Sequence, residues 1–250
     1  MKVVGMIPAR LQSSRLPGKA LVDIMGLPMV IHTCKRAQLA KSLDEIYLAT
    51  DSERIRDVAE MHGINVIMTG SHHISGSDRL AEACQYIDCD VVVNIQGDEP
   101  LVDPAHINAI IEPLRNDPSI QITVGITPYG KKNSASDIKA VIDLYSDIMY
   151  CSRTDIPSDA RSPVKELFKM VFIVPFRKKF LLEYTSWQST PLEKIEFNEY
   201  LRVLEHGIKM RAVIVHNAKI SVDTHEDLEE VRKMIVKDEL KYKYMCKTNG

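Results

Sequence analysis

The chain has 250 residues, of which 45% are hydrophobic and 26% are charged, as is usual for a globular protein with a substantial core. Its formal net charge of −2 provides no general attraction for nucleic acid or anionic membranes, so any phosphate binding must be local. No apolar run approaches the roughly 20 residues of a membrane span, and the N-terminus lacks a secretory pattern. We therefore expect a cytoplasmic enzyme without a nucleic-acid or membrane partner.

The first 19 residues form the most informative segment. Residues 3–7 are apolar and predict a buried strand, and the loop that follows, up to Lys19, carries two arginines, two serines and a glycine. In α/β proteins a strand, a basic glycine-containing loop and a helix bind polyphosphate, because backbone N–H groups and positive charges converge on its oxygens. Arg10, Arg15 and Lys19 lie where the first strand ends, the edge at which open α/β sheets bind ligands. This position favours phosphate binding over an ordinary basic surface loop.

Strand-like and helix-like segments then alternate along the first half of the chain. Apolar runs predict buried strands at residues 3–7, 45–49, 65–68, 91–95 and 122–126. Helical stretches are predicted at residues 29–40, 52–62, 79–86 and 105–116, two of them after the capping pairs Asp51-Ser52 and Asp103-Pro104. Such alternation predicts an α/β fold with a mostly parallel central sheet flanked by helices.

The pattern changes after residue 118. Strands are predicted at residues 140–142, 148–151, 168–175 and 209–216, and helices at residues 193–206 and 227–239. Residues 241–250 form a lysine-rich tail. The five cysteines are odd in number and include no close Cys-x-x-Cys pair, so we expect reduced thiols at Cys34, Cys84, Cys89, Cys151 and Cys246.

Two aspartates occupy positions suited to a metal ion. Asp98 lies beside Gly97, just past the strongest strand candidate, and Asp223 follows a later strand candidate. Mg²⁺ prefers oxygen ligands and usually takes one or two carboxylates together with phosphate oxygens and water. Alternatively, Asp98 stabilises a turn and Asp223 caps a helix. A capping role for Asp223 would be compatible with metal binding by the same segment.

Ser75-Gly76-Ser77-Asp78-Arg79 lies between a predicted strand and a predicted helix. Small residues here would let the backbone approach a flat nucleotide base, and they would equally form a helix N-cap. His72 and His73 just upstream have no matching metal-ligand cluster in the sequence and are interpreted as loop residues.

Four motifs occur in an order that resembles one family. They are P-A-R-x-x-S-S-R-L-P-G-K at residues 8–19, S-G-S-D-R at 75–79, N-I-Q-G-D-E-P at 94–100 and V-D-T at 222–224. This order is similar to that of the sugar-acid cytidylyltransferases, above all the CMP-Kdo synthetases, over residues 2–235. The resemblance implies a Rossmann-related, nucleotide-diphospho-sugar transferase-like fold in one domain, residues 1–250. Its nucleotide-binding half would end near residue 120, and residues 121–240 would complete the sheet and form a smaller acceptor and dimerisation subdomain.

The same resemblance implies residue roles in the nucleotide site. Arg10, Lys19, Asp98 and Asp223 would be catalytic, and the two aspartates would hold Mg²⁺ between the α-phosphate and the acceptor oxygen. The residues implied to bind CTP are Pro8, Ala9, Arg10, Arg15, Lys19, Ser75, Gly76, Ser77, Arg79, Gln96 and Asp98.

The acceptor side both matches and departs from the family pattern. The implied acceptor-binding residues are Gln96, Lys139, Arg153, Glu199 and Tyr200. The family carries a histidine where this chain has Met170, a tyrosine at Val174 and a glutamine at Tyr200. A site that hydrogen-bonds a substrate hydroxyl rejects an analogue without that hydroxyl by about 10⁴-fold. These changes therefore indicate that the acceptor differs from ordinary Kdo or that Kdo is bound differently.

The sequence therefore predicts a CTP-dependent, homodimeric transferase that activates Kdo or a Kdo-like acid for bacterial surface polysaccharide. Alternatives are a cytidylyltransferase for 8-amino-Kdo or a nonulosonate, and a non-catalytic nucleotide-binding homologue. A dinucleotide-dependent oxidoreductase is excluded, because no G-x-G-x-x-G follows the first strand.

Overall fold

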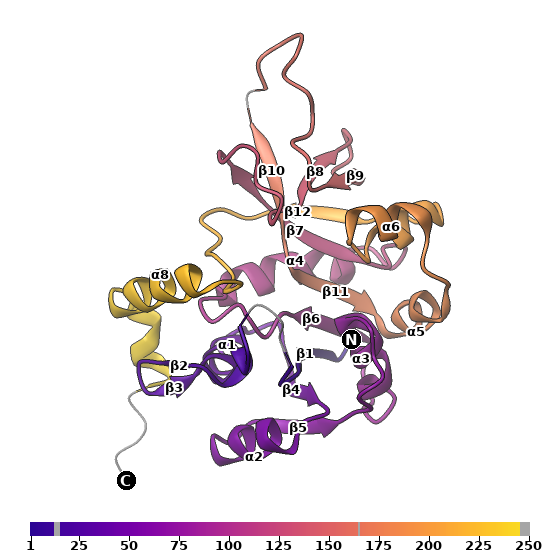
Figure 1. The fold of residues 1–250 in the computed structure, drawn as a ribbon. Coiled ribbons are helices and arrows are strands. Elements are labelled where there is room, and N and C mark those ends of the chain that lie inside the picture. The colour runs from indigo at the N-terminus through magenta and orange to yellow at the C-terminus, as the bar shows by residue number, and fades with distance from the viewer. Residues whose placement is uncertain (13–15, 165, 246–250) are drawn as a thin grey trace.

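The computed structural model describes residues 1–12, 16–164 and 166–245. Arg15, Cys246 and the end of the predicted tail lie outside these ranges. A first sheet of five strands has the order β11-β6-β1-β4-β5 (Figure 1). Its strands are β1 (Val3–Ala9), β4 (Glu45–Thr50), β5 (Asn65–Met68), β6 (Val91–Ile95) and β11 (Ile173–Arg177). Only β11 runs antiparallel to its neighbour, which confirms the predicted mostly parallel sheet.

A second five-stranded sheet lies above the first and has the order β12-β7-β10-β8-β9. It consists of β7 (Thr123–Tyr129), β8 (Lys139–Ile142), β9 (Ile148–Ser152), β10 (Leu167–Val171) and β12 (Arg211–Ile214). The prediction that residues 122–126 belong to the parallel sheet was therefore wrong. The second half completes the first sheet through β11, and its other strands form the separate second sheet. The predicted strand at residues 168–175 is in fact two strands, because the chain bends at Phe172 and passes from the second sheet to the first.

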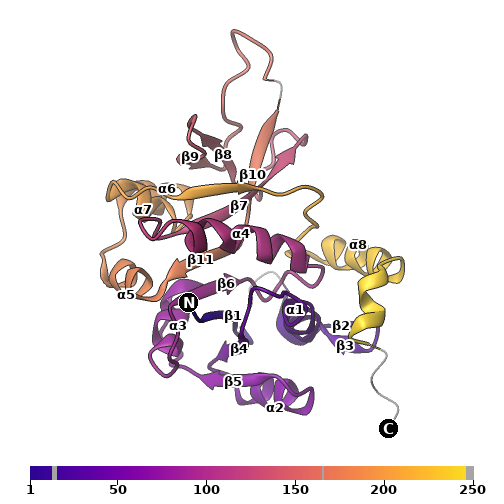
Figure 2. The same cartoon turned by 180° about the vertical axis from the view of Figure 1, so that it is seen from behind.

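Helices cover both faces of the first sheet. On one face, α1 (Met29–Ala37), α2 (Glu53–Met61) and α4 (Pro104–Asn116) pack on β1, β4 and β6 through a shared apolar cluster. On the other face, α3 (Gly76–Cys84) and α5 (Lys178–Ser186), a helix that the sequence analysis did not predict, belong to a second cluster. That cluster continues into the second sheet, and α4 lies between the two sheets in both views (Figures 1 and 2).

The helix starts follow from the sequence. Ser52 accepts a hydrogen bond from the backbone of Ile55, and Asp103 accepts one from Ala105, as the predicted capping pairs require. Ser75 forms a capping box with Asp78 at the start of α3. The caps therefore fix the loops that precede α2, α3 and α4.

The remaining elements close the sides of the molecule. The predicted helix at residues 193–206 is two short helices, α6 (Pro191–Glu196) and α7 (Leu201–Glu205), because Phe197 adopts the left-handed conformation with φ 50°. The helix α8 (His225–Val236) packs beside α1 and the hairpin of β2 (Asp23–Ile24) and β3 (Leu27–Pro28) (Figure 2). Two 3₁₀ helices, η1 (Lys19–Leu21) and η2 (Glu239–Lys243), complete the described chain. Among the described helices, none is both long and apolar enough to cross a bilayer.

Candidate active site

A cavity of about 280 Å³ opens where β1 and β6 end. The basic loop after β1, the start of α3 and the loop after β6 form its walls, and Asp223 also lines it, so all four sequence motifs meet there. The predicted nucleotide-binding residues that line it are Pro8, Ala9, Arg10, Lys19, Ser75, Gly76, Arg79, Gln96 and Asp98. Ser77 is fully buried and does not line the cavity, and Arg15 lies outside the described residues.

The two predicted metal-binding aspartates meet at the floor of this cavity. The Nζ of Lys19 lies 2.6 Å from Oδ2 of Asp98 and 3.2 Å from Oδ1 of Asp223, and it donates to the carbonyl of Val222 at 2.7 Å. One cationic group thus contacts both carboxylates. Asp223 does not cap α8, because Thr224 supplies that cap in a capping box with Asp227. The Asp223 carboxylate therefore faces the cavity, which it lines.

A second cavity, also of about 280 Å³, lies between the loop that follows β6 in the first sheet and the loops of the second sheet. It shares Gln96, Asp98 and Asp223 with the first. Its other walls come from the loop before β8, from β10 and from the segment that joins α6 to α7. The carboxylate pair therefore stands at the junction of two adjoining cavities, each large enough for part of a two-substrate complex.

The family model described as Cytidylyltransferase matches residues 4–236. The chain belongs to the cytidylyltransferase family. It is 40% identical to the 3-deoxy-manno-octulosonate cytidylyltransferase of Geobacter metallireducens over 245 residues, covering 92% of this chain and 96% of that one. The corresponding protein of Tolumonas auensis is also 40% identical, with 94% and 97% covered. A solved CMP:2-keto-3-deoxy-manno-octonic acid synthetase complexed with CTP is 33% identical, with a TM-score of 0.91 and 95% and 99% covered.

These relatives establish this cytidylyltransferase as a CTP-using nucleotidyltransferase, as the sequence predicted. They also confirm the family resemblance and the fold class. The motifs that resemble this family line the cavity at the end of β1.

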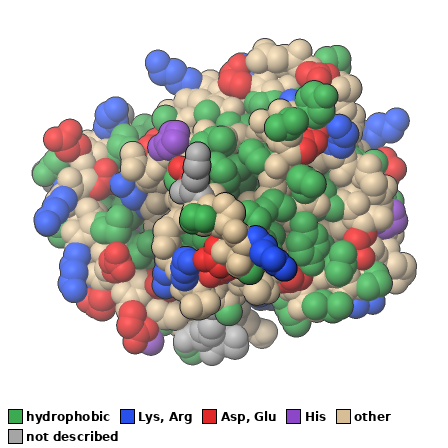
Figure 3. Space-filling model, turned by 90° about the horizontal axis from the view of Figure 1, so that it is seen from above, with side chains coloured by type: hydrophobic (Ala, Val, Ile, Leu, Met, Phe, Trp, Pro, Cys, Tyr) green, Lys and Arg blue, Asp and Glu red, His purple; other side chains and the backbone are tan. Residues whose placement is uncertain are grey.

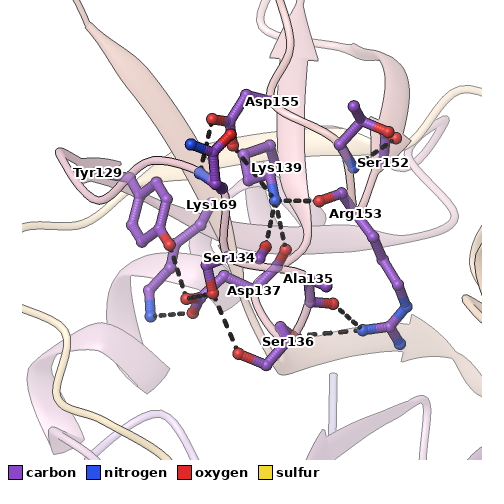
Figure 4. Close-up of polar contacts among 12 residues, drawn as sticks. Tyr129, Ser134, Ala135, Ser136, Asp137, Lys139, Ser152, Arg153, Asp155 and Lys169 are labelled. Carbon is purple, nitrogen blue, oxygen red and sulfur yellow. Dashed lines mark hydrogen bonds and ion pairs between the residues drawn. The ribbon is translucent and has the colours of Figure 1, made fainter.

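Among the predicted acceptor-binding residues, Gln96, Arg153, Glu199 and Tyr200 line the second cavity. The structure does not bring Lys139 to that cavity, because its side chain is fully buried. Its ammonium donates to the carbonyls of Ser134, at 2.6 Å, and Asp137, at 3.0 Å, and to the carbonyl of Arg153 (Figure 4). Lys139 thus fixes the backbone of the cavity wall from behind.

Arg153 is also engaged with backbone groups. Its guanidinium donates to the carbonyls of Glu196 at 2.7 Å, Ala135 at 2.9 Å and Phe197 at 3.1 Å. The Arg153 side chain therefore ties the loop before β8 to the end of α6, and Figure 4 shows its contact with the loop before β8.

The three residues that depart from the family pattern, Met170, Val174 and Tyr200, belong to one apolar cluster. The Tyr200 hydroxyl accepts a hydrogen bond from Nδ2 of Asn94 at 3.2 Å, and the Tyr200 ring stacks on Phe172 at 6.2 Å between centroids. Met170 receives a contact from Nδ2 of Asn198 at 3.8 Å to its sulfur. Val174 is fully buried and does not line the cavity. Met170, Phe172 and Tyr200 therefore give this wall an apolar and aromatic part, beside the polar groups of Asn198, Glu199 and Lys169.

Sequence reasoning missed an ion pair in the second cavity. The Nζ of Lys169 lies 2.8 Å from Oδ1 of Asp137, whose other oxygen accepts from Tyr129 and Ser134 at 2.7 Å each. Burial opposes ionisation of Asp137, but these hydrogen bonds outweigh it and lower its pKa to about 2. No local motif marks this pair, because Asp137 and Lys169 lie 32 residues apart.

Glu99 was also missed, although it directly follows Asp98 in the motif. It lines the second cavity, where burial and then the neighbouring carboxylates of Asp98 and Asp223 raise its pKa to about 8. The cavity junction therefore concentrates three carboxyl groups, with Lys19 and Lys169 as the nearby cations that oppose this shift.

Proposed function

We propose that this cytidylyltransferase transfers CMP from CTP to the anomeric hydroxyl of a 3-deoxy-2-keto sugar acid, Kdo or a Kdo-like acid. The observation that carries the proposal is the junction of two cavities at Asp98 and Asp223. The relatives named 3-deoxy-manno-octulosonate cytidylyltransferase support the acceptor class, and the CTP complex of a similar synthetase supports the nucleotide. The product would serve the synthesis of bacterial surface polysaccharide.

The carboxylate pair fits a magnesium ion. Two carboxylate oxygens already approach one cationic group, the ammonium of Lys19, and oxygen donors are the ligands that Mg²⁺ prefers. Asp98 and Asp223 would hold the ion, which would neutralise phosphate charge and lower the pKa of the acceptor hydroxyl.

The remaining residues bind and orient the substrates. Arg10 and Lys19 face the cavity at the end of β1, where they would hold the triphosphate and stabilise the charge that grows on pyrophosphate. Arg79 is positioned by Thr69, at 2.6 Å, and Asp51, at 3.5 Å, beside the Ser75 segment that would receive the base and ribose. A bond forms between the acceptor oxygen and the α-phosphorus while the bond to the bridging oxygen of pyrophosphate breaks, and the hydroxyl proton leaves to solvent. Positioning and charge stabilisation supply the rate without a protein nucleophile.

The altered acceptor wall determines which acid fits. Met170 replaces a family histidine, and Tyr200 directs its hydroxyl to Asn94 and its ring to Phe172. These side chains present fewer hydrogen-bonding groups to a sugar hydroxyl, so we propose that the acceptor is a Kdo-like acid or that Kdo is bound differently from the family pattern. 8-Amino-Kdo and the nonulosonates are the alternatives within the same reaction.

We also propose a cytoplasmic homodimer. Cys34, Cys84, Cys89 and Cys151 carry free thiols in the described chain, and a reducing compartment keeps thiols in this state.

Support for the homodimer comes from the edge strand β9 and the adjacent α6, which expose the large apolar side chains of Met149 and Ile195.

The test is pyrophosphate release by purified protein with Mg²⁺ and CTP against Kdo, 8-amino-Kdo, sialic acid and pseudaminic acid. We expect one acid to be activated at least about 10-fold faster than the others. Asp98→Asn and Asp223→Asn should each lower that rate by at least about 100-fold, because each removes a ligand of the catalytic cation. Asp57→Asn, an exposed position on α2, is the matched control and should leave the rate unchanged.

Two results would contradict or narrow the proposal. If CTP binds but no acid releases pyrophosphate, the chain is a non-catalytic homologue or uses another acceptor class. If Kdo is the fastest substrate, the transferase assignment stands, a modified acid is not required, and the altered residues change only how Kdo is bound.

A further inference from the structure

Two histidines and a glutamate converge at the rim of the nucleotide cavity. Within the described part of the chain, the ligand atoms of His72, His73 and Glu82 all lie within 4.8 Å of one another. His72 and His73 belong to the loop that joins β5 to α3, and Glu82 projects from the second turn of α3. The sequence analysis found no partner for the two histidines, because their partner lies nine residues farther along a helix.

The structure holds this cluster in place before any ligand binds. Both carboxylate oxygens of Glu82 accept hydrogen bonds from the backbone N–H of Gly70, at 3.0 and 3.2 Å. Nε2 of His73 bonds to Oε2 of Glu82, and the two imidazole rings pack at 4.3 Å between centroids. The same hydrogen bonds, from His73 first and Gly70 second, lower the pKa of Glu82, so the carboxylate is charged at neutral pH.

Gly70 makes room for the ring of His72. A Cβ at residue 70 would lie 2.4 Å from Cε1 and 2.5 Å from Nδ1 of His72, closer than side chains pack. The absence of a side chain at Gly70 is thus what allows the His72 ring to sit over the loop and beside His73. A methyl group at residue 70 would therefore clash with the ring of His72, whereas it would meet Oε2 of Glu82 only at an ordinary contact distance of 3.5 Å.

The donor set selects a class of metal ion. Two imidazole nitrogens and one carboxylate oxygen are ligands for Zn²⁺ and similar transition-metal ions, whereas Mg²⁺ prefers oxygen alone. Zinc bonds to such ligands are about 2.0–2.2 Å long, so three groups within a 4.8 Å span close on one ion with small rotations. The exposed ring of His72 has the freedom to make that adjustment.

We propose that His72, His73 and Glu82 bind Zn²⁺ or a similar transition-metal ion, which clamps one wall of the nucleotide cavity. His73 and Ile74 line that cavity, and Ser75 directly after them caps α3. An ion bound to both histidines and to Glu82 would fix this loop to α3. This cation site is separate from the carboxylate pair at Asp98 and Asp223, and it is independent of which acid is the acceptor.

The experiment is a titration of the metal-stripped full-length protein with Co²⁺, whose absorption reports tetrahedral nitrogen and oxygen ligation, followed by displacement with Zn²⁺. Excess Mg²⁺ is present throughout, so that the carboxylate pair does not compete. We expect one ion per chain. His72→Ala and Glu82→Gln should each weaken binding by at least about 10-fold, since even loss of a residue that only supports a ligand weakens metal affinity by about 10- to 100-fold.

Two further variants make the outcome specific. Gly70→Ala should weaken binding mainly through displacement of the His72 ring, and His62→Ala, a histidine at the C-terminal end of α2 and outside the cluster, should leave it unchanged. Hydrogen exchange of residues 70–76 should slow on addition of Zn²⁺ in the parent and not in His72→Ala. Equal affinity in the parent and His72→Ala, or no tetrahedral Co²⁺ spectrum, would overturn the proposal and leave His73 and Glu82 as an ion pair that ties the loop to α3.

Discussion

Asp137 stabilises the wall of the second cavity as an ionised group. Its carboxylate accepts hydrogen bonds from Lys169, Tyr129 and Ser134, and its folded-state pKa of about 2 lies below the ordinary value of 3.8. A carboxylate with a depressed pKa contributes stability that is fully present above the unfolded pKa. That contribution is lost as the pH falls through about 4 towards about 2.

We expect Asp137→Asn to lower the free energy of unfolding by about 2 kcal/mol at pH 7, because one pKa unit corresponds to about 1.4 kcal/mol. The parent should then lose this increment between about pH 4 and pH 2, so the two proteins should converge in acid. Urea denaturation at several pH values measures this, with Asp57→Asn on exposed α2 as the control. A difference between parent and variant that is the same at pH 7 and pH 3 would contradict the assignment.

Individual residues differ in how far the sequence reveals them. That the residues proposed to bind the nucleotide lie around one cavity could be predicted, because contiguous motifs carry them and strand ends bring the motifs to one edge. Lys139 matched the family pattern, yet its side chain is buried beneath three backbone carbonyls. Such burial depends on how the loop before β8 folds back over the strand, and no local pattern records it. The Asp137–Lys169 pair was missed for the same reason.

Packing of α4 between the two sheets requires a glycine in β7. A Cβ at Gly125 would lie 2.6 Å from Cδ1 of Ile110 on α4 and 3.1 Å from Cβ of Val171 on β10. Thr123 in the same strand donates its hydroxyl to the carbonyl of Ile110 at 2.7 Å. The helix and the strand therefore approach closely over at least two residues of β7, and the second sheet is seated on α4 by that contact.

We expect Gly125→Ala to lower the free energy of unfolding by about 1–3 kcal/mol, because overpacking a close contact forces side chains or backbone to shift. Gly130→Ala is the matched control, since nothing lies within 4 Å of the Cβ that it adds. Ile110→Val in the Gly125→Ala background should recover part of the loss by removing the atom that clashes. Urea denaturation of the four proteins measures this, and equal destabilisation by the two alanine substitutions would contradict it.

Among the elements, those with buried and periodic sequences were predicted well. The strands of the parallel sheet and the helices α1, α2 and α4 follow the apolar pattern and the caps, with shifts of a few residues at their ends. The apolar run at residues 168–175 gave no sign of the bend at Phe172, because both strands are buried and read as one continuous segment. The break at Phe197 was equally invisible, since only its left-handed backbone separates α6 from α7.

On the scale of the whole molecule, the candidate site arises where the two sheets meet. An isolated bridge between Ile122 and Phe176 joins the sheets, and β11 returns the chain to the first sheet after the second is largely built. Sequence motifs located the nucleotide side of the site, whereas the acceptor side depends on which sheet each later strand joins. That assignment needs the tertiary structure.

The proposed dimer surface lies at the edge of the second sheet. Met149 on β9 is 65% exposed and Ile195 on α6 is 75% exposed. The two elements are joined through Glu196, which accepts hydrogen bonds from Ser152 at 2.7 Å and from the backbone of Arg153 at 2.8 Å. Figure 3 views the molecule from above and shows apolar side chains gathered over the middle of this face and towards the side of α6. An apolar patch at an unpaired strand edge favours contact with another chain.

If this surface forms the homodimer, Met149→Glu combined with Ile195→Glu should place four like charges in the interface of two chains and raise the dissociation constant by at least about 100-fold. Sedimentation velocity should show a dimer for the parent and a monomer for the double variant. Met61→Glu, an equally exposed apolar position on α2 (76%), is the control and should leave the dimer intact. A monomeric parent would refute the dimer, and a double variant that still dimerises would place the interface elsewhere. Because β9 leads into Arg153 and the acceptor cavity, loss of the dimer should also weaken acceptor binding while CTP affinity is retained.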